Sequence, residues 1–76
     1  MNEKRRKSLR AAIDHLEKAS DIVQDCMSDE QNAFYSLPEQ LQWTERGEKM
    51  EEAVSAMEEA VDLINQATEL VGQASE

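Results

Sequence analysis

The stretch MEEAVSAMEEAVDLINQATELV, residues 50–71, decides the fold because it carries two apolar stripes at helical spacing. One stripe steps alternately by four and three residues, which is the a/d pattern of a heptad repeat. The second, rich in alanine, runs beside it with the same period. A helix with so broad an apolar face is expected to contact two neighbouring helices. The stripes are Met50, Val54, Met57, Val61, Ile64, Thr68 and Val71, and Ala53, Ala56, Ala60, Leu63, Ala67, Leu70 and Ala74.

The first part of the chain, from Glu3 to Phe34, has a helical pattern of its own. Its apolar residues recur at a, d and e positions of a heptad, interrupted by Glu30, and it contains no Gly or Pro to stop a helix. We therefore expect one long helix. The apolar positions are Leu9, Ala12, Ile13, Leu16, Ala19, Val23, Cys26, Met27, Ala33 and Phe34.

The residues between these segments predict a break. Pro38 cannot lie inside a helix. Ser36 and Glu39 have the spacing of a capping box, which predicts a short helical turn over residues 39–42. Thr44 is a favourable N-cap for the next helix. Near its start, Gly47 indicates a close backbone approach or a frayed first turn, and at the other end Gly72 is a candidate C-cap.

Two helices of similar length with a short connection indicate an all-α fold, an antiparallel two-helix hairpin. We expect a single domain over residues 1–76, with helices at about 3–34 and 44–73 and a turn at 35–43. So small a chain has difficulty burying a sufficient core alone, and the second stripe favours a homodimer that forms a four-helix bundle. A heterodimer, a larger assembly, or a wide face that wraps one helix are the alternatives. The predicted oligomer interface is Ala53, Ala56, Ala60, Leu63, Ala67 and Leu70.

The net charge of −9 is unevenly distributed. Residues 1–20 hold six basic and three acidic side chains, whereas residues 21–76 hold two basic and fourteen acidic ones. Such an acidic balance argues against direct binding of nucleic acid, which requires Lys and Arg at the phosphates. The hairpin would bring the basic segment 4–10 beside Glu69 and Glu76. With neither a secretory signal nor a membrane-spanning segment, we expect a soluble, cytoplasmic protein.

Catalysis is not predicted. The only histidine, His15, and the only cysteine, Cys26, lie three helical turns apart and cannot meet within one helix. No Glu-x-x-His pair, zinc spacing or glycine-rich phosphate loop is present, so we expect no metal and no cofactor. Cys26 occupies a core-type position and is expected to be a buried thiol.

Two features are candidates for binding a partner. The three aromatic residues, Phe34, Tyr35 and Trp43, all flank the turn, where they either close the end of the bundle with Leu37 and Leu41 or anchor a partner protein. The second feature is a stripe of carboxylates along the second helix, either a solvated surface, a docking face for a basic protein or a mimic of nucleic acid. The candidate partner-binding residues are Tyr35, Trp43, Glu52, Glu59 and Asp62.

The turn Ser36-Leu37-Pro38-Glu39-Gln40-Leu41-Gln42, followed by the helix start from Thr44 to Ala53, resembles small uncharacterised proteins of Gram-positive bacterial phages and mobile elements. The resemblance covers about residues 30–65. It implies an accessory protein of a phage or mobile element that binds a host component. The favoured function is therefore a non-enzymatic protein–protein interaction module. The alternatives are a nucleic-acid-mimicking inhibitor of a host defence or nucleic-acid-binding protein, and a purely structural oligomerisation module.

Overall fold

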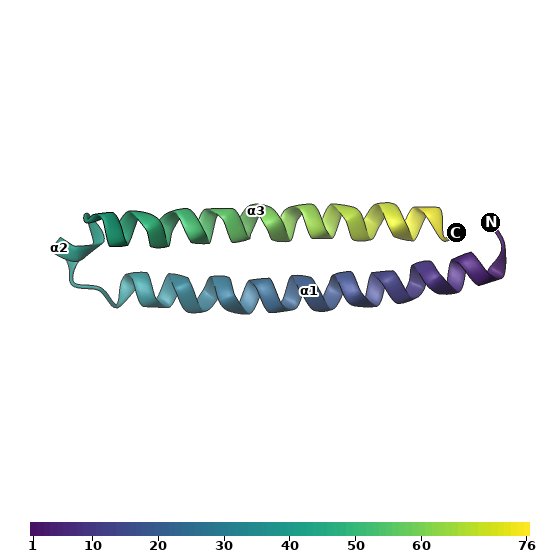
Figure 1. Ribbon diagram of the computed structural model, residues 1–76, viewed down its shortest axis with the longest axis horizontal. Coiled ribbons are helices and arrows are strands. Elements are labelled where there is room, and N and C mark those ends of the chain that lie inside the picture. Colours follow the sequence, from purple (N-terminus) through teal and green to yellow (C-terminus); the bar gives the residue numbers. More distant parts are fainter.

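The computed structural model describes all 76 residues and shows two long helices packed antiparallel. The helices are α1 (Glu3–Tyr35) and α3 (Glu45–Ala74), and the connection holds the single turn α2 (Glu39–Gln42). Both termini lie at one end and α2 lies at the other, which we call the tip (Figure 1). The Cα atoms extend over 58 × 14 × 12 Å. The predicted all-α hairpin and its helical turn at residues 39–42 are confirmed.

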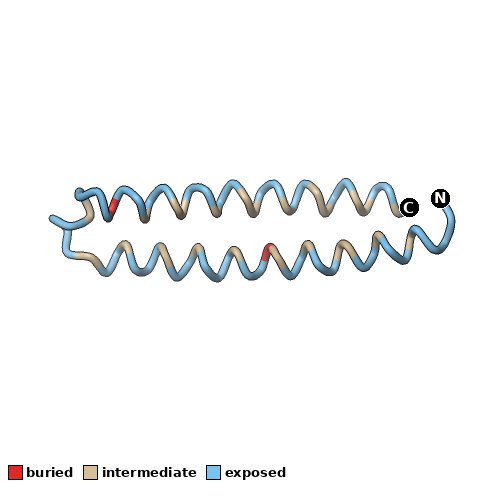
Figure 2. Tube along the Cα trace, viewed as in Figure 1, coloured by how far each residue is buried: buried red, intermediate tan, exposed pale blue.

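The two helices meet along a seam of half-buried side chains. On α3 the seam is the predicted a/d stripe, and all seven of its residues are half-buried. No hydrophobic side chain of the hairpin is completely buried, and the two buried residues are Ser20 and Gly47 (Figure 2). The hairpin therefore has a contact line rather than an enclosed core. On α1 the seam is Leu9, Ile13, Leu16, Ser20, Val23, Met27, Glu30 and Phe34.

The seam of α1 follows part of the predicted a, d and e face. It passes through the a and e positions, the latter being Ile13, Ser20, Met27 and Phe34. Of the d positions, Ala12 and Ala19 are half-buried, whereas Cys26 and Ala33 are exposed. This choice turns the longer side chains toward α3 and leaves the smaller ones on the flank. The expectation of a buried Cys26 thiol was wrong, because Cys26 lies on that flank and is exposed.

A polar contact crosses the seam near its middle. Ser20, the only buried polar side chain, donates from Oγ to Oδ1 of Asn65 at 3.2 Å. One turn along α1, Gln24 donates from Nε2 to the Ser20 hydroxyl at 3.0 Å. A buried hydroxyl without partners costs about 1–3 kcal/mol. The contact therefore favours the one alignment of α1 and α3 that sets Ser20 opposite Asn65.

The helix ends depart from the predicted caps. The Asn2 side chain caps α1 by accepting from the backbone N–H of Arg5 at 2.8 Å. Thr44 occupies the N-cap position of α3, yet its hydroxyl donates to the carbonyl of Leu41 instead of accepting from α3. At the other end, α3 continues through Gly72 to Ala74, so the expectation of a C-cap at Gly72 was wrong.

The capping box expected at Ser36 and Glu39 does not form. The Ser36 hydroxyl donates back to the carbonyl of Asn32 at 2.8 Å, and Pro38 is the N-cap residue of α2. Gln42 stabilises the connection instead. Its side-chain amide lies within hydrogen-bonding distance of the carbonyl oxygens of Phe34, at 3.4 Å, and Leu37, at 3.1 Å.

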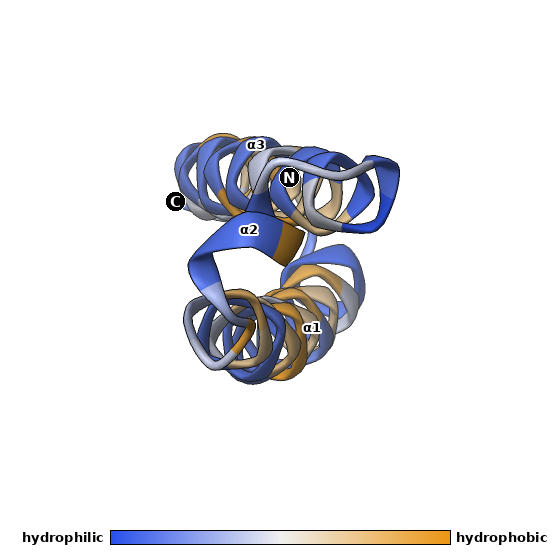
Figure 3. Cartoon of the chain, turned by 90° about the vertical axis from the view of Figure 1, so that its left-hand side faces the viewer, coloured by the Kyte–Doolittle hydropathy of each residue, from blue (hydrophilic) through white to orange (hydrophobic).

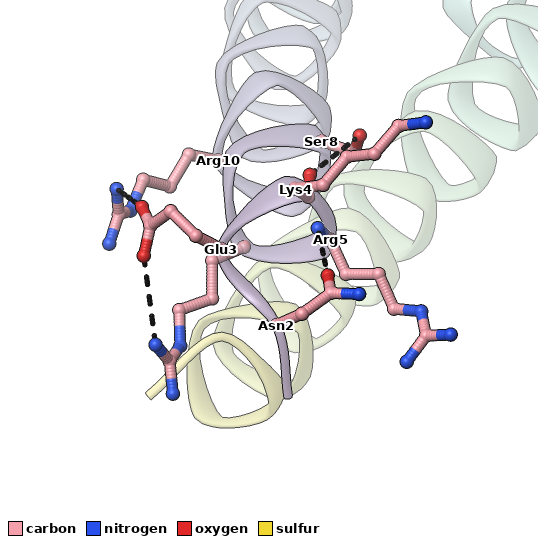
Figure 4. A network of polar contacts seen from close by, with 7 residues as sticks. Asn2, Glu3, Lys4, Arg5, Ser8 and Arg10 are labelled. Atoms are coloured by element: carbon pink, nitrogen blue, oxygen red, sulfur yellow. Dashed lines mark hydrogen bonds and ion pairs between the residues drawn. The ribbon is translucent and has the colours of Figure 1, made fainter.

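The basic N-terminus pairs within its own helix and not with α3. The carboxylate of Glu3 forms ion pairs with the guanidinium groups of Arg6, with an N–O distance of 3.6 Å, and Arg10, with an N–O distance of 3.5 Å (Figure 4). The third salt bridge of the structure joins Lys49 and Glu45 at 3.3 Å. The expected ion pairs with Glu69 and Glu76 are not formed. The other N-terminal cations, Lys4, Arg5 and Lys7, therefore have no carboxylate partner within the hairpin.

Gly47 marks the close backbone approach that was one of its two predicted roles. It is buried in the first turns of α3, and a Cβ atom added to it would overlap the backbone carbonyl of Gln42. A carbonyl held by its own chain cannot move aside as a flexible side chain can. Glycine at position 47 thus allows the connection to pass directly over the start of α3.

We expect opposite effects from alanine at the two glycines. Gly47→Ala forces a clash with Gln42 and should lower the free energy of unfolding by about 1–3 kcal/mol. Gly72→Ala is the control, because a Cβ at Gly72 meets no atom within 4 Å. It should raise stability by about 0.5–1 kcal/mol through helix propensity. Thermal unfolding followed by circular dichroism measures both changes, and equal Tm values for the two variants would contradict the close approach.

Candidate functional site

The tip presents aromatic side chains to solvent. Trp43 is 80 % exposed and Tyr35 is 69 % exposed, whereas Phe34 and Leu37 are half-buried. The rings of Phe34 and Tyr35 pack edge to face with centroids 5.6 Å apart and an interplanar angle of 66°. Of the two sequence interpretations, closure of the bundle end therefore holds for Phe34 and Leu37. It does not hold for Tyr35 and Trp43, nor for Leu41, which is exposed.

Local geometry explains this division. Successive residues of a helix point about 100° apart, so that when Phe34 enters the seam, Tyr35 must point to one side. The same holds at α2, where Gln42 turns inward to the carbonyls of the connection and Trp43, the C-cap residue, turns outward. The exposure of both rings is therefore a consequence of the backbone path.

Two adjoining depressions lie beneath these rings. The larger, of about 280 Å³, is lined by Gln31, Phe34, Tyr35, Glu51, Val54 and Ser55. The smaller, of about 230 Å³, is lined by Phe34, Gln42, Trp43 and Glu51. Phe34 and Glu51 belong to both, and we call the combined surface the tip groove. Its lining combines three aromatic side chains, several polar ones and the carboxylate of Glu51, which both depressions share.

The tip groove is well suited to a cation carried on an apolar segment. A Lys or Arg side chain binds to the face of an aromatic ring within about 6 Å, and a carboxylate such as Glu51 adds a charge-assisted contact. The surroundings reinforce this preference, because residues 35–52 carry five carboxylates and two basic groups. One of the carboxylates, Glu45, is already paired with Lys49.

The predicted acidic residues lie on the outer side of α3. Glu52, Glu59 and Asp62 are all exposed and form no salt bridge. Part of this stripe borders an open, shallow depression lined by Glu48, Glu51, Glu52, Ser55, Ala56 and Glu59. Since Glu51 also lies in the tip groove, the acidic stripe and the tip groove form one continuous negative surface.

The predicted oligomer interface divides into two rows. Ala53, Ala60 and Ala67 are half-buried beside the seam. One step further around α3, Ala56, Leu63 and Leu70 are exposed. The first row thus contributes to the hairpin itself, and the second row has no partner within the chain.

The only histidine and the only cysteine both belong to α1, where they are three helical turns apart. His15 and Cys26 are both exposed on α1, and no cluster of three or more His, Cys, Asp or Glu side chains is arranged to hold a metal ion. Neither long helix combines the length and apolar character that a membrane span requires.

Comparisons of the chain with known protein families, with curated proteins and with solved structures found no match. The function must therefore be inferred from the geometry of the hairpin alone. Within that geometry, the tip groove is the one place where aromatic rings and a carboxylate converge.

The single tryptophan gives a direct check of the tip. Because Trp43 is largely surrounded by water, its fluorescence emission should resemble that of free tryptophan, and acrylamide should quench it efficiently. Thermal unfolding should change the emission maximum little. A blue-shifted maximum in the folded protein that moves to longer wavelength on unfolding would show that the ring is packed against the bundle end.

Proposed function

We propose that this chain is a non-enzymatic protein-binding module whose tip groove docks a basic, partly apolar segment of a partner protein. The observation that carries the proposal is the exposure of Tyr35 and Trp43 around the Glu51 carboxylate. Large aromatic residues are the most frequent binding hot spots, and an exposed pair is costly unless it is covered in a complex.

The rigidity of the surroundings supports this role. Tyr35 ends a 33-residue helix and packs against Phe34, while Trp43 follows a turn held by the Gln42 side chain. Groups held in place before binding lose little conformational entropy in the complex. The partner that we propose is a host protein, which is what the role of an accessory protein of a phage or mobile element would require.

Mimicry of nucleic acid through the acidic stripe is the second candidate. Its support is the row of unpaired carboxylates that includes Glu52, Glu59 and Asp62. The two candidates respond differently to salt. A complex made by a carboxylate row weakens steeply with ionic strength, whereas an aromatic anchor is affected little.

Capture from the lysate of a Gram-positive bacterium tests the proposal. Trp43→Ala and Tyr35→Ala should each weaken the captured complex by about 30-fold or more, as expected for a hot spot of at least 2 kcal/mol. Gln66→Ala, an exposed position far from the tip, is the control. The complex should survive about 0.5 M NaCl, where the Debye length falls to a few ångströms.

Two results would count against tip docking. In the first, both aromatic variants capture the same proteins as the native chain. In the second, capture is abolished by salt and by neutralising Glu52, Glu59 and Asp62 to their amides, which would favour mimicry.

A further inference from the structure

One flank of the hairpin is apolar and the other is polar. The polar flank is identified by its contacts, because Gln24 and Asn65 meet there around Ser20, and Gln31 and Glu51 line the same depression. On α1, Gln24 and Gln31 each come four residues after a seam residue. On α3, Glu51 and Asn65 each come one residue after a seam residue. The residues on the opposite side of the two seams must therefore lie together on the other flank.

We call this second flank the apolar face. It contains small residues in both helices and three large ones that the hairpin leaves uncovered, namely Ile22, Leu63 and Leu70, which are 53 %, 56 % and 63 % exposed. Apolar segments are accordingly not confined to the space between the helices (Figure 3). The polar residues His15 and Asp29 share the helical position of Ile22 and border the face along α1, and Ala56 borders the acidic depression on α3. The apolar residues of the face are Ala12, Ala19, Ile22, Cys26 and Ala33 from α1 and Ala53, Ala56, Ala60, Leu63, Ala67 and Leu70 from α3.

The elongated hairpin exposes more surface than a compact chain of its mass. A compact monomer of 8.6 kDa exposes about 4,700 Å² by the scaling of surface with mass. The hairpin exposes 5784 Å², an excess of about 1,100 Å². A stable interface of standard size buries about 800 Å² on each partner. One side of a standard interface is therefore smaller than the excess area of this rod, and the alanines of the apolar face would let another helix approach closely.

The distribution of charge along the hairpin favours a second copy of the chain as the partner and an antiparallel orientation of the two copies. The Ser20–Asn65 contact divides the hairpin into two parts. The part that includes the tip, residues 21–64, holds twelve acidic and two basic groups and has a charge of −10. The remainder holds five acidic and six basic groups, a charge of +1, with its unpaired Lys4, Arg5 and Lys7 at the very end. Two copies side by side with tips together would place both charges of −10 at one end, whereas reversing one copy brings its basic end beside the other's acidic tip.

We propose that the apolar face binds a second copy of this chain in antiparallel orientation, forming a four-helix bundle with two-fold symmetry. The two tips then lie at opposite ends, separated by about the 58 Å length of the hairpin. Neither Tyr35 nor Trp43 lies on the apolar face, so both tip grooves stay open. The assembly presents two binding sites that face away from each other.

Sedimentation equilibrium of the full chain tests the interface. The native chain should be a dimer, and Leu63→Glu with Leu70→Glu should weaken dimerisation at least about 100-fold, because four large side chains leave the interface. Gln66→Glu with Gln73→Glu is the matched control, since it adds the same charge at the same spacing on an outward side of α3. A native chain that is monomeric at about 100 µM, or a control that dissociates as the leucine variant does, would overturn the proposal.

Orientation is measured with Leu63 and Leu70 intact, so that the only change within the apolar face is the conservative Cys26→Ser. A spin label at Gln40→Cys, in a chain with Cys26→Ser, marks the tip. The antiparallel bundle should give an inter-label distance of about 50 Å or more. Tips held together would give less than about 30 Å, because neighbouring helices lie 8–10 Å apart, and this result would overturn the orientation.

Tests of the dimer and tests of tip docking use different variants, so that one proposal can fail without the other. Trp43→Ala should leave the dimer intact. The leucine variant, checked by circular dichroism for helix content, should keep the native Trp43 emission.

Discussion

The packing of α1 against α3 along a heptad seam is the constraint on which the rest of this molecule depends. Both helices place seam residues at alternating steps of three and four, which keeps one line of side chains in contact over the length of the hairpin. Such a line buries each side chain only in part. The hairpin therefore gains its shape from the seam, and it leaves apolar surface beside the seam unsatisfied.

Two local contacts fix the alignment that the seam alone would leave loose. Apolar seam residues of similar size tolerate a shift of one heptad, whereas Ser20 finds its partner Asn65 in only one alignment. At the tip, Gly47 lets the backbone at Gln42 pass directly over α3. Together they determine where the connection ends, and thereby where Tyr35 and Trp43 stand.

The sequence predicted the helices, the antiparallel hairpin, the short turn at residues 39–42 and the seam of α3, because each depends on spacing or on a single strong residue such as Pro38. On α1 the predicted face was too broad, because Cys26 and Ala33 fit a heptad as well as Met27 and Phe34 do. The choice between the two patterns depends on which side chains fill the space against α3, and this is a property of the pair of helices. The spacing of apolar residues within one helix therefore cannot predict which of the two patterns faces the partner helix.

The tip was harder to predict for a related reason. A cluster of aromatic residues beside a turn is compatible with a closed bundle end and with an exposed anchor, and the two differ only in which way each residue points. The inward rotation of Gln42, which occupies the backbone carbonyls of Phe34 and Leu37, decides the matter by turning Trp43 outward. The sequence carried no signal of this, because Gln40 and Gln42 both lie in the turn and only the structure shows that Gln42 is the one that bonds the backbone.

The two flanks of the seam differ in which contacts they can make. The polar flank, with Gln24, Gln31, Glu51 and Asn65, is unsuited to close packing against another chain but opens directly into the tip groove. The apolar flank ends at Ala33 and Ala53, before the tip is reached. A second chain packed on the apolar flank would thus leave the groove accessible. Because one helix pair carries both surfaces on opposite sides, self-association and partner binding can occur together without competing for the same residues.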